Sequence, residues 1–144
     1  MKTAMNTISD SPSSSIDEFR LQAFVNRTMG DLAAGYVGVM VSIGRQLGLY
    51  EVMNGAGPLT SFEVATRAHC AERYVREWLN GQVAGCYLIY HPSSAAYELP
   101  PEQALVLADR NSPVYIAPAW EVPASMWADQ AKTLEAFRSG GGVP

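Results

Sequence analysis

Apolar residues recur with helical spacing along most of the chain, and a strand-like pattern appears only around residues 87–99. In residues 16–29, IDEFRLQAFVNRTM, the apolar side chains gather near one side, which predicts a helix. Gly30 could end this helix, and Asp31 could cap the next one. The pattern therefore predicts two separate helices between residues 16 and 53.

The second of these helices, residues 32–53, is apolar around much of its circumference. Its large side chains follow a 4-3-4-3 spacing that predicts one apolar stripe: Tyr36, Met40, Ile43, Leu47 and Tyr50. A helix with apolar residues all round must be covered on several sides. Gly35 and Gly38 would let another backbone approach closely. The cover could come from the same domain or from a partner subunit, and both interpretations stay open.

Residues 57–97 combine a short helix, a longer helix and a hairpin. Thr60 and Glu63 have the T-x-x-E spacing of a capping box, which predicts the start of the short helix. The longer helix has an inward face at i, i+3, i+4 and i+7 spacing: Ala71, Tyr74, Val75, Trp78, Leu79, Gln82, Val83 and Cys86. The β-rich YLIY, a turn at Pro92 and a return through Tyr97 predict two strands. This order predicts a mainly α fold, a winged helix-turn-helix with a small two-stranded β wing.

The remainder of the chain predicts the domain organisation. A short helix is expected at residues 102–108, and a helix from about Val122, with Trp120, Trp127 and Leu134 at heptad spacing. We expect residues 1–15 to form a disordered tail. Residues 16–139 are expected to form one winged-helix domain with flanking dimerisation helices. The glycine run within residues 140–144 is expected to begin a linker to a missing domain.

The composition indicates a globular chain. Its net negative charge gives no general electrostatic attraction to nucleic acid or to anionic membranes. Of the 144 residues, 48% are hydrophobic and 17% are charged, and the net charge is −4. The longest uncharged run, residues 32–44, is shorter than the roughly 20 apolar residues that cross a bilayer. The Ser-rich start lacks the apolar stretch of a secretion signal, and two cysteines are too few for a disulfide framework. We therefore expect a cytoplasmic protein.

The charges of the helix-turn-helix argue against DNA as its partner. Arg67, Arg73 and Arg76 are balanced by three glutamates, and the wing tip HPSSAA has no lysine or arginine. Glu72 with Arg76, and Arg73 with Glu77, have the i,i+4 spacing of ion pairs. We expect the unit to pack against protein. A dimeric winged-helix transcriptional regulator that binds DNA through Arg73 and Arg76 and takes a hydrophobic effector is the alternative. A non-catalytic interaction module is a third.

Metal binding and nucleophilic catalysis have little support. His69, Cys70, Cys86 and His91 lack the paired spacing of structural zinc ligands. Adjacent side chains such as His69 and Cys70 diverge, so they do not make a nucleophile–base pair. We expect free thiols, no metal and no catalytic residue.

Several stretches resemble a known family. TSFEVATRAHCAERYVREWLNGQVAGCYLIY, followed by YELPPEQALVLAD and NSPVYIAPA, is similar to the N-terminal domain of bacterial class I S-adenosylmethionine-dependent methyltransferases. The segments MGDLAAGYVGVMVSIGRQLGLYEVM and EAFRSGGGVP fit the same pattern, so the resemblance covers roughly residues 24–144. One departure is His69-Cys70, where such proteins usually carry a glycine before the second helix. Histidine tolerates a positive φ better than most residues, so the turn is expected to survive.

The resemblance implies a division of labour. The N-terminal domain would form a homodimer and cover the pocket of a small-molecule substrate. A C-terminal Rossmann-like domain would hold S-adenosylmethionine. The strand, glycine-rich turn and helix that such a cofactor needs do not occur in this sequence, so we expect neither cofactor binding nor catalysis from it alone.

Five aromatic and apolar residues are candidates for lining the substrate pocket: Tyr36, Met40, Tyr115, Trp120 and Trp127. An apolar pocket of this kind would suit an aromatic or lipid-like substrate. Residues at helical spacing are also what a plain core or a dimer interface would contain, and for each residue taken alone that interpretation is favoured.

Overall fold

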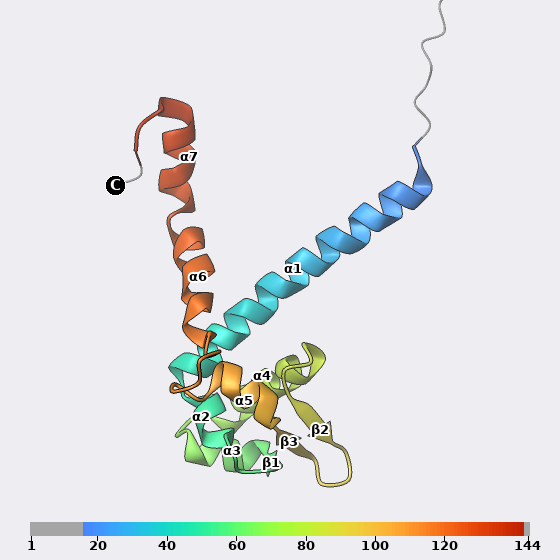
Figure 1. Ribbon diagram of the computed structural model, residues 1–144, viewed down its shortest axis with the longest axis vertical. Helices are drawn as coiled ribbons and strands as arrows, with labels where there is room; N and C mark the ends of the chain where they lie inside the picture. Colours follow the sequence, from blue (N-terminus) through green and yellow to red (C-terminus); the bar gives the residue numbers. More distant parts are fainter. Residues whose placement is uncertain (1–15, 143–144) are drawn as a thin grey trace, which may run out of the picture. The chain divides into compact units, whose positions relative to one another are not determined.

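A computed structural model describes residues 16–142 of the chain, so the predicted disordered tail at residues 1–15 lies outside the described residues (Figure 1). The described part contains seven α-helices, one 3-10 helix and one three-stranded sheet. The described residues divide into two units, with the boundary between Leu32 and Ala33. The mainly α fold that the pattern predicts is confirmed.

A single helix, α1 (Glu18–Gln46), replaces the two helices that were predicted around Gly30. That prediction was wrong: Gly30 has no positive φ, and Asp31 lies inside the helix instead of capping one. A glycine within a helix costs only about 1 kcal/mol relative to alanine, and no proline interrupts this segment. Glycine alone therefore does not end the helix.

The apolar stripe predicted from Tyr36 to Tyr50 does not run along a single helix. Tyr36 is 70% exposed, and Ile43 and Leu47 are exposed as well. The buried positions of α1 are small residues and one valine: Gly38, Val41, Ser42 and Gly44. The stripe is interrupted because α1 ends at Gln46 and Gly48, with φ +68, turns the chain into α2 (Leu49–Met53). Tyr50 is therefore buried on a different helix.

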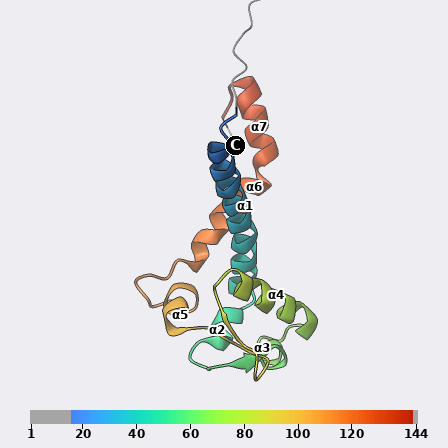
Figure 2. The same cartoon turned by 90° about the vertical axis from the view of Figure 1, so that its right-hand side faces the viewer.

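The winged helix-turn-helix follows in the expected order (Figures 1 and 2). It consists of β1 (Leu59–Thr60), α3 (Ser61–Arg67), α4 (Glu72–Ala84), β2 (Ile89–His91), β3 (Ala96–Glu98) and α5 (Pro101–Leu107). The sheet is antiparallel with order β1-β3-β2, and Tyr97 of β3 lies between Leu59 and Tyr90. The short strand β1 is a third strand beyond the two-stranded wing that was predicted.

Both ends of α3 are fixed by local hydrogen bonds. The predicted capping box is present, because the Glu63 amide donates to Thr60 Oγ1 at 3.3 Å and the Thr60 amide donates to Glu63 Oε2 at 2.8 Å. At the other end His69 adopts φ 53, and the Cys70 amide donates to the Ala65 carbonyl at 2.9 Å. These bonds form a Schellman motif with histidine at the position that glycine usually holds. The expectation that this turn survives is confirmed.

The inward face of α4 is narrower than the sequence pattern predicts. Val75, Trp78, Leu79 and Gln82 are buried, whereas Tyr74 is 74% exposed and Cys86 is exposed. Cys86 was expected on the inward face, but α4 ends at Ala84 and Cys86 follows it in a left-handed conformation with φ 62. The helical periodicity was extended beyond the end of α4, and it therefore placed Cys86 on the buried face although the residue is exposed.

The core joins α1, α2 and α4. Trp78 Nε1 donates to the Met40 carbonyl at 2.7 Å, and the Tyr50 and Trp78 rings meet edge to face at 5.0 Å. The Tyr50 hydroxyl donates to Gln82 Oε1, and burial raises the pKa of Tyr50 well above its ordinary value. These contacts, together with the apolar residues around them, give the winged helix its own core.

The C-terminal segment contains η1 (Ala117–Trp120), α6 (Glu121–Ala128) and α7 (Gln130–Ser139). The predicted helix from about Val122 is present, but it is divided at Asp129. Pro123 lies in the first turn of α6, where the proline removes no helical hydrogen bond. Neither α6 nor α7 contains a buried residue. No described helix is long and apolar enough to cross a membrane.

Candidate functional site

An apolar groove of about 260 Å³ lies between α1 and the start of the C-terminal segment. One wall is a face of α1 with mostly small side chains: Ala34, Gly35, Gly38, Val39, Ser42 and Ile43. The other wall comes from Trp120, Pro123, Ala124 and Trp127. Serine is the one polar residue type in this lining, so the groove favours an uncharged, apolar occupant.

Gly38 allows the close approach of the two walls. A Cβ atom added at Gly38 would lie 2.6 Å from Cε3 and 2.6 Å from Cζ3 of Trp120, so the indole occupies the space that a side chain would need. Gly35, one turn earlier, has no heavy atom within 4 Å of the equivalent position. Gly38 is therefore needed for packing, whereas Gly35 leaves the groove open.

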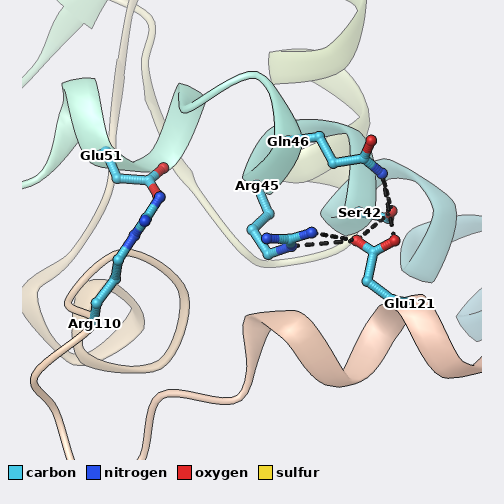
Figure 3. A network of polar contacts seen from close by, with 6 residues as sticks. All are labelled: Ser42, Arg45, Gln46, Glu51, Arg110 and Glu121. Carbon is cyan, nitrogen blue, oxygen red and sulfur yellow. Dashed lines mark hydrogen bonds and ion pairs between the residues drawn. The ribbon is translucent and has the colours of Figure 1, made fainter.

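A polar cluster lies beside the groove at the first residue of α6 (Figure 3). Glu121 Oε1 accepts from Ser42 Oγ at 3.0 Å and from Arg45 Nη2 and Nε at 2.9 and 3.2 Å. Glu121 Oε2 accepts from Gln46 Nε2 at 3.4 Å, and the same nitrogen donates to Ser42 Oγ at 2.9 Å. The three donor residues have i, i+3 and i+4 spacing, so they face one way from the last turns of α1.

These hydrogen bonds favour the charged form of the carboxyl. The bonds from Arg45 and then Ser42 hold the pKa of Glu121 below its usual value. A second pair, Arg110 Nη2 with Glu51 Oε1 at 3.1 Å, ties the loop after α5 to α2 (Figure 3). Charge-assisted bonds therefore join α6 to α1 and the loop after α5 to α2.

The five residues proposed to line a substrate pocket do not lie together. Trp120 and Trp127 line the groove, whereas Met40 and Tyr115 are partly buried against the core. Tyr36 is exposed and is not part of the groove lining. Whether any of them contacts a substrate stays a prediction.

Sequence reasoning missed most of the groove and all of the polar cluster. Gly35 and Gly38 gave a signal, since glycines in a helix were taken to permit a close approach, but the group that approaches is the Trp120 side chain. Glu121 gave no local signal, because its partner Arg45 lies 76 residues away in the sequence.

The exposed face of the helix-turn-helix carries charges of both signs. Arg76 Nε lies 3.8 Å from Glu72 Oε1, as predicted, and Ser61 Oγ donates to the same oxygen at 2.6 Å. Arg73 and Glu77 are both exposed, and they are not among the ion pairs of residues 16–142. In the wing, His91 Nε2 lies 2.7 Å from Glu98 Oε2 across the two strands. The face therefore has no excess of cationic side chains.

Two helical surfaces expose large apolar side chains. The N-terminal apolar surface lies on the first half of α1 and consists of Phe19, Leu21, Phe24, Val25, Met29 and Leu32. The C-terminal apolar surface lies on α6 and α7 and consists of Val122, Met126, Trp127, Leu134 and Phe137. Large exposed apolar patches are typical of surfaces that contact another protein, a membrane or a ligand.

The described residues contain no group of three histidine, cysteine or acidic side chains placed to hold a metal ion. Both thiols are free, Cys70 partly buried and Cys86 exposed. A dinucleotide-type cofactor site does not fit either, because the three short strands are antiparallel and the glycines at 140–142 follow α7 instead of a strand.

Comparison with family models gives one match. A model described as the Rv2258c-like winged HTH domain matches residues 35–109, just over half of the chain. No curated protein matches the chain.

Solved structures with the same fold include methyltransferases. The N,N-8-amino-8-demethyl-D-riboflavin dimethyltransferase of Streptomyces davawensis is 17% identical with a TM-score of 0.68, over 83% of this chain and 35% of that one. Human N-acetylserotonin methyltransferase in complex with SAM is 16% identical with a TM-score of 0.62, over 90% and 37%. PigF with SAH is 19% identical with a TM-score of 0.62, over 81% and 36%. The chain thus spans about a third of the length of these proteins and is similar to their N-terminal part.

Proposed function

This chain belongs to the Rv2258c-like winged helix-turn-helix domain family. We propose that it is the dimerisation and substrate-lid domain of an S-adenosylmethionine-dependent methyltransferase. The observation that carries the proposal is the pair of exposed apolar surfaces attached to a winged helix whose charges balance. The likeness to part of several methyltransferase structures supports the same assignment.

The proposed dimerisation is supported by the exposure of the N-terminal apolar surface. An isolated helical stretch of about 15 residues is marginally stable in water, and most helical stability in proteins comes from packing of an apolar face. Every residue of α1 from Glu18 to Leu32 is exposed. A second copy of the chain would supply the missing packing, since it carries the same apolar surfaces and a closed dimer buries both.

The lid role is proposed from the groove. Its walls are apolar and aromatic, and they would exclude water from an uncharged small-molecule substrate. Residues of this chain would orient the substrate and keep it dry, which favours a methyl transfer that requires in-line geometry.

In this proposal the cofactor binds to a separate domain and not to residues 16–142. S-adenosylmethionine, when bound, supplies the methyl group, but the described residues do not fit it. We therefore propose that a C-terminal methyltransferase domain holds the cofactor, and that residues 16–142 contribute neither a cofactor ligand nor a general base.

The direct test is a binding comparison on the purified chain. Isothermal titration with S-adenosylmethionine should give no binding heat, and anisotropy of a fluorescently labelled DNA duplex should not change. Tight cofactor binding would overturn the assignment of the cofactor to another domain.

A DNA-binding regulator is a second candidate, because Arg73 and Arg76 are exposed in the first turns of α4, where recognition helices contact bases. That function requires duplex binding that weakens steeply with salt and is lost in Arg73→Ala/Arg76→Ala. Arg67→Ala, at the end of α3, is the matched control. Salt-sensitive binding that depends on Arg73 and Arg76 would replace the lid proposal with this one.

A further inference from the structure

The helices α6 and α7, residues 121–139, form a projecting segment that we call the arm. The arm contains no buried residue. Within residues 16–142, Glu121 makes every hydrogen bond that joins an arm side chain to another element of the fold. The hydrogen-bonded attachment of the arm is therefore concentrated at its first residue, Glu121.

The residue before Glu121 gives a second, apolar point of attachment. Trp120 packs against the core and places its indole over Gly38, at the distance where a Cβ atom would clash. Gly38 and Ser42 are one helical turn apart on α1, so the apolar and polar attachment points share one face of that helix.

The polar attachment point consists of three hydrogen-bond donors on α1 that surround the carboxylate of Glu121. Glu121 receives four hydrogen bonds from Ser42, Arg45 and Gln46, and two of them come from one guanidinium. Bonds between a guanidinium and a carboxylate are stronger than neutral ones and fix the orientation of both groups. Figure 3 shows the three α1 side chains directed at the single carboxylate of Glu121.

From these contacts we propose that Trp120 and Glu121 form a two-point latch that holds the arm against α1, and that releasing the latch opens the groove. The inference rests on the proposed lid function, since it names the part of the lid that moves. Pro123, Ala124 and Trp127 lie just after the latch and make most of one groove wall. The groove therefore exists only while the latch is engaged.

Hydrogen exchange on the full chain, followed by mass spectrometry, tests the latch. In Glu121→Ala we expect amide protection within residues 121–139 to fall about tenfold, because a short helix without tertiary contacts is marginal. Protection within residues 59–107 should stay unchanged, which shows that the winged helix is still folded. Gly38→Ala should lower arm protection in the same way from the apolar side.

Glu135→Ala is the matched control, because Glu135 lies on the arm and its ion pair with Arg138 at 3.9 Å stays within α7. Arm protection in this variant should stay within about twofold of the wild-type value, since no bond to α1 is lost. Equal protection in Glu121→Ala and wild type would overturn the latch. Arm protection that follows protein concentration and ignores Glu121 would also overturn it, because a second copy would then hold the arm.

A failure of the latch can be distinguished from a failure of the proposed function. The exchange experiment needs no substrate, cofactor or further domain. A failed latch would leave the dimer and the lid assignment standing, whereas DNA binding would remove the lid assignment and leave the latch intact.

Discussion

The winged helix and the arm use the same kinds of residue in opposite ways. In the winged helix, large apolar side chains such as Leu79 and Val64 are fully buried by neighbouring elements of the same chain. In the arm, Trp127 and Phe137 are 72% and 86% exposed, and the attachment depends on Glu121 and the preceding tryptophan. One region is stabilised by its own core, whereas the other leaves its large apolar side chains exposed.

The largest expected difference is in the free energy of unfolding, between a substitution in the core of the winged helix and one in the arm. Leu79→Ala should lower the free energy of unfolding by roughly 2–5 kcal/mol at every protein concentration, because it leaves a cavity in the core. Phe137→Ala should cost less than about 0.5 kcal/mol at low concentration, where no second copy covers it. Urea denaturation followed by circular dichroism at several concentrations measures both. A large, concentration-independent cost of Phe137→Ala would contradict the comparison.

Alanine substitutions at two glycines of α1, Gly38 and Gly35, should have opposite effects on stability. Gly38→Ala should destabilise the fold by roughly 1–3 kcal/mol, because the added methyl group meets the Trp120 ring. Gly35→Ala has open space and should stabilise the helix by up to about 1 kcal/mol. Thermal unfolding of the two variants should therefore shift in opposite directions. A shift of both in the same direction would mean that the Trp120 contact is absent in solution.

A smaller effect concerns the left-handed residue after α4. Cys86→Gly should raise stability by roughly 0.5–1 kcal/mol, because glycine adopts φ 62 without the steric cost that a Cβ atom brings. Cys86→Ala is the control and should give no such gain. Equal stability of the glycine and alanine variants would show that the turn is not left-handed.

The smallest effect is the pH dependence of the arm. The pKa of Glu121 is lowered in the fold, so the bonds to Arg45 and Ser42 contribute stability above the unfolded value of 4.5. That contribution is lost as the pH falls through the folded pKa. The stability difference between wild type and Glu121→Gln should therefore be largest near neutral pH and narrow in acid. Thermal unfolding of both proteins from pH 7 down to pH 3 measures it, and a constant difference would contradict the assignment.

The parts of the fold that could be predicted are those with local signals. Thr60 and Glu63 are three residues apart and cap each other, and the left-handed turn at His69 follows from the end of a short helix. The helix end predicted at Gly30 was wrong, because a glycine permits a helix to end there but does not force it to. The prediction of one stripe from Tyr36 to Tyr50 was wrong, because the chain changes direction at Gly48, between Leu47 and Tyr50.

The candidate site could be predicted only in part. The tryptophans were found from their size and spacing, and two of the five proposed residues line the groove. The pairing of Glu121 with Arg45 could not be found, because a surface carboxylate reveals nothing about a partner 76 residues earlier. The burial of glycine and serine instead of tyrosine on α1 likewise depends on where Trp78 and Trp120 pack.

Sedimentation equilibrium over a wide concentration range measures whether this chain forms the proposed dimer. We expect a dimer for the wild type, and dissociation to monomers for Phe19→Asp/Phe24→Asp, which places charges on the N-terminal apolar surface. Leu105→Asp, at a comparably apolar but separate position that is 47% exposed on α5, should remain a dimer. A wild-type chain that is monomeric at every concentration, or a dimer that Phe19→Asp/Phe24→Asp leaves intact, would contradict the account.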